Sequence, residues 1–238
     1  MVDKIVIKQI VDDVILKCGI SMKKIREGIS STIEGITDND YEKNLLLEEI
    51  TRFYYENDKK DYESASEIFF NGEKYSNEGR ETNVSLSPEV IKEGKENGLL
   101  FAIHNHPHIG YCIPSLQDFI NFSELDVKYG VVVGKGGVFI VKTPVPNNLD
   151  GEEFYPTIRQ DLEEYVRQGT RDLFHEEFQK VDEDFHNNRI DVDTANQRAN
   201  KLYNKWMGTD NHLKDCADFL NREGEENGFD TRVHYIEF

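Results

Sequence analysis

The feature that most constrains the fold is an apolar run that ends in two closely spaced histidines. Residues 99–103 are all apolar, which predicts a buried strand. His104 and His106 follow at its end, and because side chains alternate along a strand, both imidazoles project from the same face. Pro107 stops the strand immediately afterwards. We therefore expect both histidines to reach one metal ion.

A helix start follows a short loop after this strand. Ser115 is a typical N-cap, and Asp118 stands three residues later, which is the spacing of a capping box. Asp118 in the first turn is therefore expected to point back toward His104 and His106. Two neutral nitrogens and one carboxylate leave a fourth position for water, which is the ligand set of catalytic rather than structural zinc.

These residues resemble the signature of the JAMM (MPN, also JAB) metalloproteases, which is H-x-H-P, a short loop and S-x-x-D. The sequence His-Asn-His-Pro, followed by Pro-Ser-x-x-Asp, is most similar to the motif of the prokaryotic branch and of the RadC-like proteins. Two departures are present. The segment from His106 to Asp118 is one residue longer than usual in the family, and His108 replaces a small residue. Two interpretations stay open: the loop bulges without effect, or His108 alters the coordination.

The resemblance implies an α/β (α+β) fold of the JAMM/MPN type, a cytidine-deaminase-like mixed sheet flanked by helices. It also implies a peptidase or isopeptidase that binds Zn²⁺ through His104, His106 and Asp118. In the family, a serine at the position of Ser115 stabilises the oxyanion, and a plain helix cap is the alternative role of this residue. Such sites act on protein or peptide substrates, including ubiquitin-like proteins.

The family mechanism also needs an upstream glutamate as general base, and Glu67 is our candidate. It lies at the start of an apolar strand that is followed by Asn71 and Gly72, similar to the family pattern of glutamate, apolar stretch and glycine. Other glutamates compete for this role, and in so acidic a chain each is more simply a surface residue: Glu63, Glu73, Glu78 and Glu81.

The pattern of apolar residues predicts three regions. We expect a helical N-terminal segment over 1–60, the catalytic domain over 61–145 and an acidic helical region over 146–238 that ends in a strand. Within the second region, turn residues predict two β-hairpins, one around Asn71-Gly72 and one around 134–137. The third region is expected to contain a long amphipathic pair of helices over 155–206, which could pack on the core, dimerise or bind a partner protein.

Composition limits the partners and the compartment. The 238 residues carry a formal net charge of −18, with no basic cluster large enough to neutralise phosphates, so we expect no nucleic-acid partner. Cys18, Cys112 and Cys216 are far apart and predict reduced thiols. The sequence contains no apolar run of membrane-spanning length and no secretion signal. We expect a soluble, cytoplasmic protein with no membrane partner.

Two functional hypotheses follow. Neither His-Glu-x-x-His nor Pro-Cys-x-x-Cys is present, so zincin and nucleobase-deaminase chemistry are not supported. The first hypothesis is a zinc metallopeptidase. The second is a non-catalytic, metal-binding scaffold that holds protein partners, which the longer loop and His108 favour.

Overall fold

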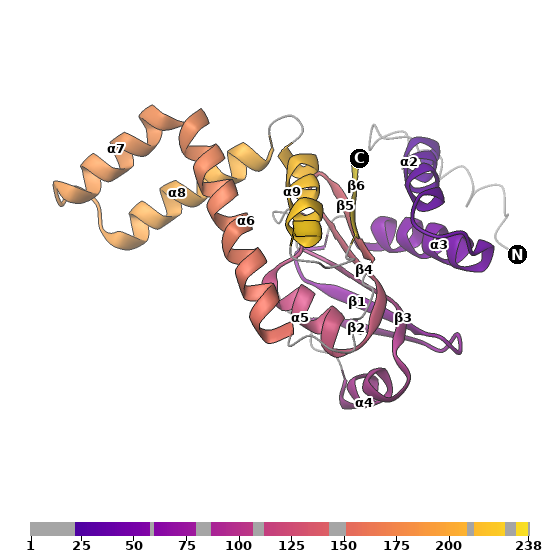
Figure 1. Cartoon of the computed structure of the whole chain (residues 1–238). Helices are drawn as coiled ribbons and strands as arrows, with labels where there is room; N and C mark the ends of the chain where they lie inside the picture. The colour runs from indigo at the N-terminus through magenta and orange to yellow at the C-terminus, as the bar shows by residue number, and fades with distance from the viewer. Residues whose placement is uncertain are drawn as a thin grey trace, which may run out of the picture.

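The computed structural model describes residues 22–57, 60–79, 87–106, 112–142, 151–208, 212–226 and 232–237, and this part of the chain contains eight helices and a six-stranded sheet (Figure 1). The helices are α2 (Met22–Glu34), α3 (Asp40–Asn57), α4 (Pro88–Asn97), α5 (Leu116–Glu124), α6 (Gly151–Leu173), α7 (His175–His186), α8 (Val192–Met207) and α9 (His212–Glu226). The strands are β1 (Ser64–Phe69), β2 (Lys74–Glu78), β3 (Leu99–Asn105), β4 (Val127–Gly134), β5 (Gly137–Lys142) and β6 (Arg232–Glu237).

The sheet is mixed, which confirms the predicted α/β class. Its strand order is β2-β1-β3-β4-β5-β6; β3 and β4 run parallel, and all other neighbours run antiparallel. Both predicted hairpins are present. Gly72 has a φ of 86° in the turn between β1 and β2, a conformation that glycine adopts without steric cost. The last strand, β6, pairs with β5 at the edge of the sheet, as its alternating sequence predicts.

Helices cover both faces of the sheet (Figure 1). On one face, Ile29 of α2 and Ile50 of α3 are fully buried in a cluster with Ile103 and Ile140 of the sheet. On the other face, α5, α6 and α9 bury a second cluster that includes Phe122. Burial of apolar residues on both faces stabilises the sheet at roughly 25 cal/mol per Å² removed from water.

A partly buried ionic contact joins α3 to the sheet. The Glu42 carboxylate accepts hydrogen bonds from Lys128 Nζ at 2.5 Å and from Tyr129 Oη at 2.6 Å, and Thr37 Oγ1 adds a third at 2.9 Å. Burial alone would raise the pKa of Glu42, but these donors hold it below its usual value. Burial, together with the hydrogen bond to Glu42, raises the pKa of Tyr129 to about 12.

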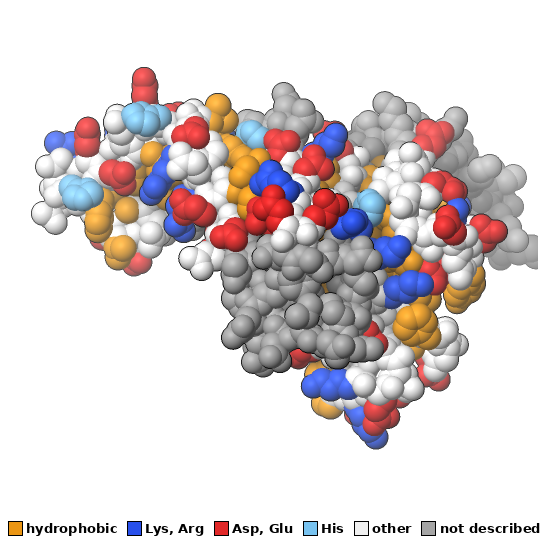
Figure 2. Space-filling model, viewed as in Figure 1, with side chains coloured by type: hydrophobic (Ala, Val, Ile, Leu, Met, Phe, Trp, Pro, Cys, Tyr) orange, Lys and Arg blue, Asp and Glu red, His pale blue; other side chains and the backbone are white. Residues whose placement is uncertain are grey.

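Residues 151–207 form three helices, α6, α7 and α8, where the sequence predicted a pair over 155–206. The break lies at Phe174, between α6 and α7, where neither glycine nor proline marks it in the sequence. Residues 170–198, here called the helical arm, extend away from the sheet (Figure 1). Acidic, basic and hydrophobic side chains are interspersed on it (Figure 2). Phe178 and Val181 are buried, whereas Leu173 and Phe185 are 54% and 42% exposed, so the predicted apolar stripe is only partly covered.

Some predictions fall outside the described residues, namely those that concern residues 1–21, Glu81 and His108. Cys18 also lies outside the described residues, while within them Cys112 and Cys216 are buried and form no disulfide. No helix in the described ranges is both long enough and apolar enough to cross a membrane.

Candidate metal centre

The register of two paired strands places Glu67 and His104 on one face of the sheet. Ala65 of β1 lies opposite His104 of β3, and Glu67 lies opposite Ala102. Directly opposed residues share a face, and so do residues two apart on one strand. The four side chains therefore form one patch on the face that α5 covers, and all four line a cavity of about 250 Å³.

Hydrogen bonds fix the end of β3 where the histidines lie. The His106 backbone N–H donates to the Val133 carbonyl at 2.8 Å and extends the pairing with β4. Asn105 accepts a hydrogen bond from the Ser64 N–H at 2.7 Å and donates one to the Tyr62 carbonyl at 3.1 Å. Asn105 therefore holds β3 against the start of β1. Its two neighbours, His104 and His106, line the cavity.

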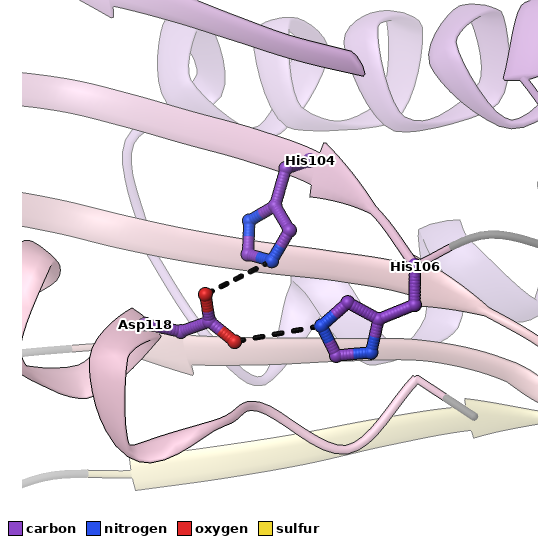
Figure 3. Close-up of side chains that lie close together, drawn as sticks. All are labelled: His104, His106 and Asp118. Carbon is purple, nitrogen blue, oxygen red and sulfur yellow. Dashed lines mark ion pairs between the residues drawn. The ribbon is translucent and has the colours of Figure 1, made fainter. Parts of the chain in front are cut away.

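Asp118 reaches both histidines from the first turn of α5 (Figure 3). Its Oδ1 lies 3.1 Å from His104 Nε2, and its Oδ2 lies 3.5 Å from His106 Nε2. The predicted capping box holds it there: Ser115 N–H donates to Asp118 Oδ2 at 2.6 Å, and Asp118 N–H donates to Ser115 Oγ at 3.2 Å. The helix start thus aims the carboxylate at the end of β3.

The three side chains fit a divalent metal ion. One ligand atom from each of His104, His106 and Asp118 lies within 4.8 Å of the others. His104 Nε2 is buried and has no well-aligned hydrogen-bond partner, although Asp118 Oδ1 is close. Burying a nitrogen without a hydrogen bond is costly. A metal ion bound between the three side chains would give His104 Nε2 a partner and remove this cost. This group can hold a metal ion.

The charge of Asp118 suits this role. Burial by itself would raise the pKa of Asp118, but the neighbouring His104 and His106 outweigh it and hold the pKa well below the usual value. The carboxylate is therefore ionised at neutral pH, as a metal ligand must be.

Glu67 is the most unusual carboxylate near the site. It is 1% exposed, and its Oε2 is a buried atom without a hydrogen-bond partner. Burial raises the pKa of Glu67 from 4.5 to about 8, because the charged form is poorly solvated there. A titratable group of this kind in a cavity is typical of functional sites.

The competing glutamates differ from Glu67 in their surroundings. Glu63 lines the same cavity but is less buried. Glu73 is exposed and accepts a hydrogen bond from Asn71 in the hairpin turn, and Glu78 is exposed and pairs with Lys60 at 3.0 Å. Of these glutamates, Glu67 has the burial and the raised pKa that suit a proton acceptor.

The position of Ser115 is compatible with both of the roles expected for it. Its Oγ accepts the capping hydrogen bond from Asp118 N–H, which uses a lone pair and leaves the hydroxyl proton available. Ser115 also lines the cavity beside His106 and Asp118. Helix capping and hydrogen bonding to a substrate oxygen are therefore compatible.

Part of the cavity wall was not predicted from the sequence. Phe122 lines the cavity, and its ring centroid lies 6.3 Å from that of His104. A Cβ at Gly130 would come within 2.4 Å of the Phe122 ring, so this glycine makes room for the ring against the sheet. Gly130, inside the apolar sequence of β4, is the signal that could have indicated this close approach.

Comparisons of this chain with protein-family models, with curated proteins and with solved structures returned no match. The function therefore has to be argued from the site itself. The five residues predicted from the sequence come together around one cavity: Glu67, His104, His106, Ser115 and Asp118. They offer a metal-binding group, a proton acceptor and a hydrogen-bond donor.

Proposed function

We propose that the chain is a zinc-dependent peptidase or isopeptidase of the JAMM type that hydrolyses an amide bond in a protein or peptide substrate. The observation that carries the proposal is the buried Glu67 carboxylate in the same cavity as His104, His106 and Asp118. A site that only bound a metal would not need a second buried carboxyl group whose Oε2 has no hydrogen-bond partner, since burying such a polar group is costly.

Each residue has a definite task in the proposed reaction. His104, His106 and Asp118 would hold Zn²⁺, which supplies an activated water and polarises the substrate carbonyl when it is bound. Glu67 accepts a proton from the attacking water and returns it to the leaving amine. Burial raises the pKa of Glu67 to about 8 in the metal-free protein, and a divalent cation bound beside it would favour the ionised form that accepts a proton. The Ser115 hydroxyl donates a hydrogen bond to the oxyanion, an interaction typically worth about 10²- to 10³-fold in kcat.

The variant Glu67→Gln separates catalysis from metal binding. It keeps the size and shape of the side chain but cannot accept a proton. We expect this variant to bind zinc as the wild type does and to lose hydrolysis of a fluorogenic peptide library or of ubiquitin-like fusion proteins. Hydrolysis at the wild-type rate would contradict the proposed role of Glu67.

A second candidate function is a metal-binding scaffold without turnover. The observation that favours it is the exposed apolar surface of the helical arm, where Leu173, Phe185 and Val192 are 54%, 42% and 55% exposed. In this case the zinc-loaded wild type would show no hydrolysis of any amide substrate, and Leu173→Glu would abolish association with partner proteins.

A further inference from the structure

A second, larger hollow adjoins the metal centre. Its volume is about 580 Å³, which lies within the usual range of ligand sites. His106 and Ser115 line both this hollow and the metal cavity, so the two spaces meet at these residues. The hollow, here called the α6–α8 groove, lies where α6 and α8 pack together at the base of the helical arm.

The groove is built from one face of each helix. Leu162 and Val166 of α6 are one turn apart and form part of its apolar floor with Met207 of α8. Leu162 is 1% exposed, whereas Val166 and Met207 are only half-buried. An apolar floor of this kind favours an apolar side chain in the groove, because filling it removes further apolar surface from water.

The rim of the groove carries neutral hydrogen-bonding groups. Asn200 and Asn204 of α8 are both exposed and one helical turn apart. A carboxamide donates and accepts hydrogen bonds, as a peptide group does. Asn200 and Asn204 therefore place on the rim the kind of polar groups that a peptide backbone can hydrogen-bond.

The charges of the groove disfavour an anionic ligand. Arg167 lines it, but Glu163 lines it too, and Arg167 pairs with Glu164 at 3.2 Å. The whole chain carries a net charge of −18, which repels polyanions at long range. A neutral or basic polypeptide segment with an apolar side chain is the ligand that this chemistry fits.

We propose that the α6–α8 groove binds an extended peptide segment of the substrate, with an apolar side chain seated on Leu162, Val166 and Met207. The part of the inference that concerns cleavage rests on the proposed peptidase function. The segment enters the metal cavity past His106 and Ser115, so the groove selects which bond reaches the catalytic residues. The helical region after the sheet thereby supplies substrate specificity.

Peptide binding tests the groove without turnover. The probes are two fluorescein-labelled heptapeptide libraries, one with leucine and one with aspartate fixed at the central position. Anisotropy is measured on the full chain carrying Glu67→Gln, with and without zinc. We expect the leucine library to bind at least about tenfold more tightly than the aspartate library, as burial of one apolar side chain provides. Equal binding of the two libraries would overturn the proposal.

Two tryptophan variants of α8 locate the binding. Asn204→Trp places a large ring in the groove and should weaken binding of the leucine library at least about tenfold. Lys201→Trp is the control, because Lys201 is exposed on the same helix and does not line the groove. Val166→Ala, which trims the floor without blocking the groove, should reduce the preference for leucine. Unchanged binding by Asn204→Trp would overturn the proposal.

Hydrolysis distinguishes this proposal from the proposed function. If groove-dependent binding is found but the zinc-loaded wild type cleaves neither library, the peptidase function fails and the peptide-binding groove stands. If the wild type cleaves a library and Asn204→Trp cleaves it with an unchanged KM, the groove proposal fails and the peptidase function stands.

Discussion

Ser115 and Asp118 cap the first turn of α5 reciprocally, and the carboxylate that completes this cap also faces both histidines. The backbone N–H of Ser115 donates to Asp118 Oδ2 at 2.6 Å, and that oxygen lies 3.5 Å from His106 Nε2. The Asp118 side chain therefore caps the helix and also belongs to the group that can hold a metal ion. Metal binding and the stability of the helix start are thus expected to be coupled.

Substitutions of Ser115 separate its capping role from its catalytic role. Ser115→Ala should lower the free energy of unfolding by about 1 kcal/mol through loss of the cap and lower kcat by about 10²-fold. Ser115→Asp keeps an oxygen that accepts the capping hydrogen bond but has no proton to donate. We expect it to retain stability and lose activity. Urea unfolding and peptide hydrolysis measure the two effects, and an active Ser115→Asp variant would contradict the oxyanion role.

The buried Glu67 should make the stability of the metal-free protein fall with rising pH. Its pKa is about 8 in the folded protein against 4.5 for the ordinary group. Between these pH values the folded state keeps a proton that the unfolded state has lost. The free energy of unfolding therefore decreases as pH rises through this window, by up to ~1.4 kcal/mol per pH unit from this group.

The control for this pH dependence is Glu67→Gln, which cannot titrate. Urea unfolding of both proteins in EDTA at pH 5 and pH 8 isolates the contribution of Glu67. We expect the wild type to lose more stability than the variant over this interval. Parallel profiles would mean that Glu67 is solvated in the folded protein.

The contact between Glu42 and Tyr129 should hold α3 on the sheet. Glu42→Ala leaves the Tyr129 hydroxyl and Lys128 without their acceptor, so we expect a loss of about 2–3 kcal/mol in the free energy of unfolding. Tyr129→Phe in the Glu42→Ala background should then cost much less than in the wild type. Additive effects in this double-mutant cycle would show that the two side chains do not interact.

Gly130 should be required for the position of Phe122 beside His104. Gly130→Ala forces its new methyl group against the Phe122 ring, and overpacking of this kind costs about 1–3 kcal/mol. We also expect weaker zinc binding, because the displaced ring is a neighbour of His104. In a Phe122→Leu background, Gly130→Ala should cost less in both measurements. The same cost in both backgrounds would contradict the steric explanation.

The metal-binding group could be predicted from the sequence because its signals are local. His104 and His106 follow an apolar run, and Ser115 and Asp118 have capping-box spacing. The prediction of Glu67 as a site residue also depended on the resemblance to a family. No local sequence signal shows that β1 pairs with β3 in the register that brings Glu67 opposite Ala102. Register is set by long-range pairing, which the period of apolar residues does not determine.

The helices after the sheet could be predicted only coarsely. Their amphipathic pattern indicates helix, but the break at Phe174 carries no glycine or proline signal. The α6–α8 groove depends on how α6 crosses α8, and Asn200 and Asn204 look like ordinary surface residues in the sequence. The packing angle between helices follows from side-chain contacts that a single sequence does not reveal.

Metal content shows whether His104, His106 and Asp118 form a metal centre. The wild type, His104→Ala and Asp118→Ala are each purified without added metal. Each protein is then incubated with zinc, desalted and analysed by mass spectrometry for metals. Ser76→Ala, on the edge strand β2, serves as the matched control because Ser76 does not line the cavity. We expect about one zinc per chain in the wild type and the control, and loss of zinc from both site variants. A wild type that binds no zinc, or site variants that keep it, would contradict the assignment of His104, His106 and Asp118 as a metal centre.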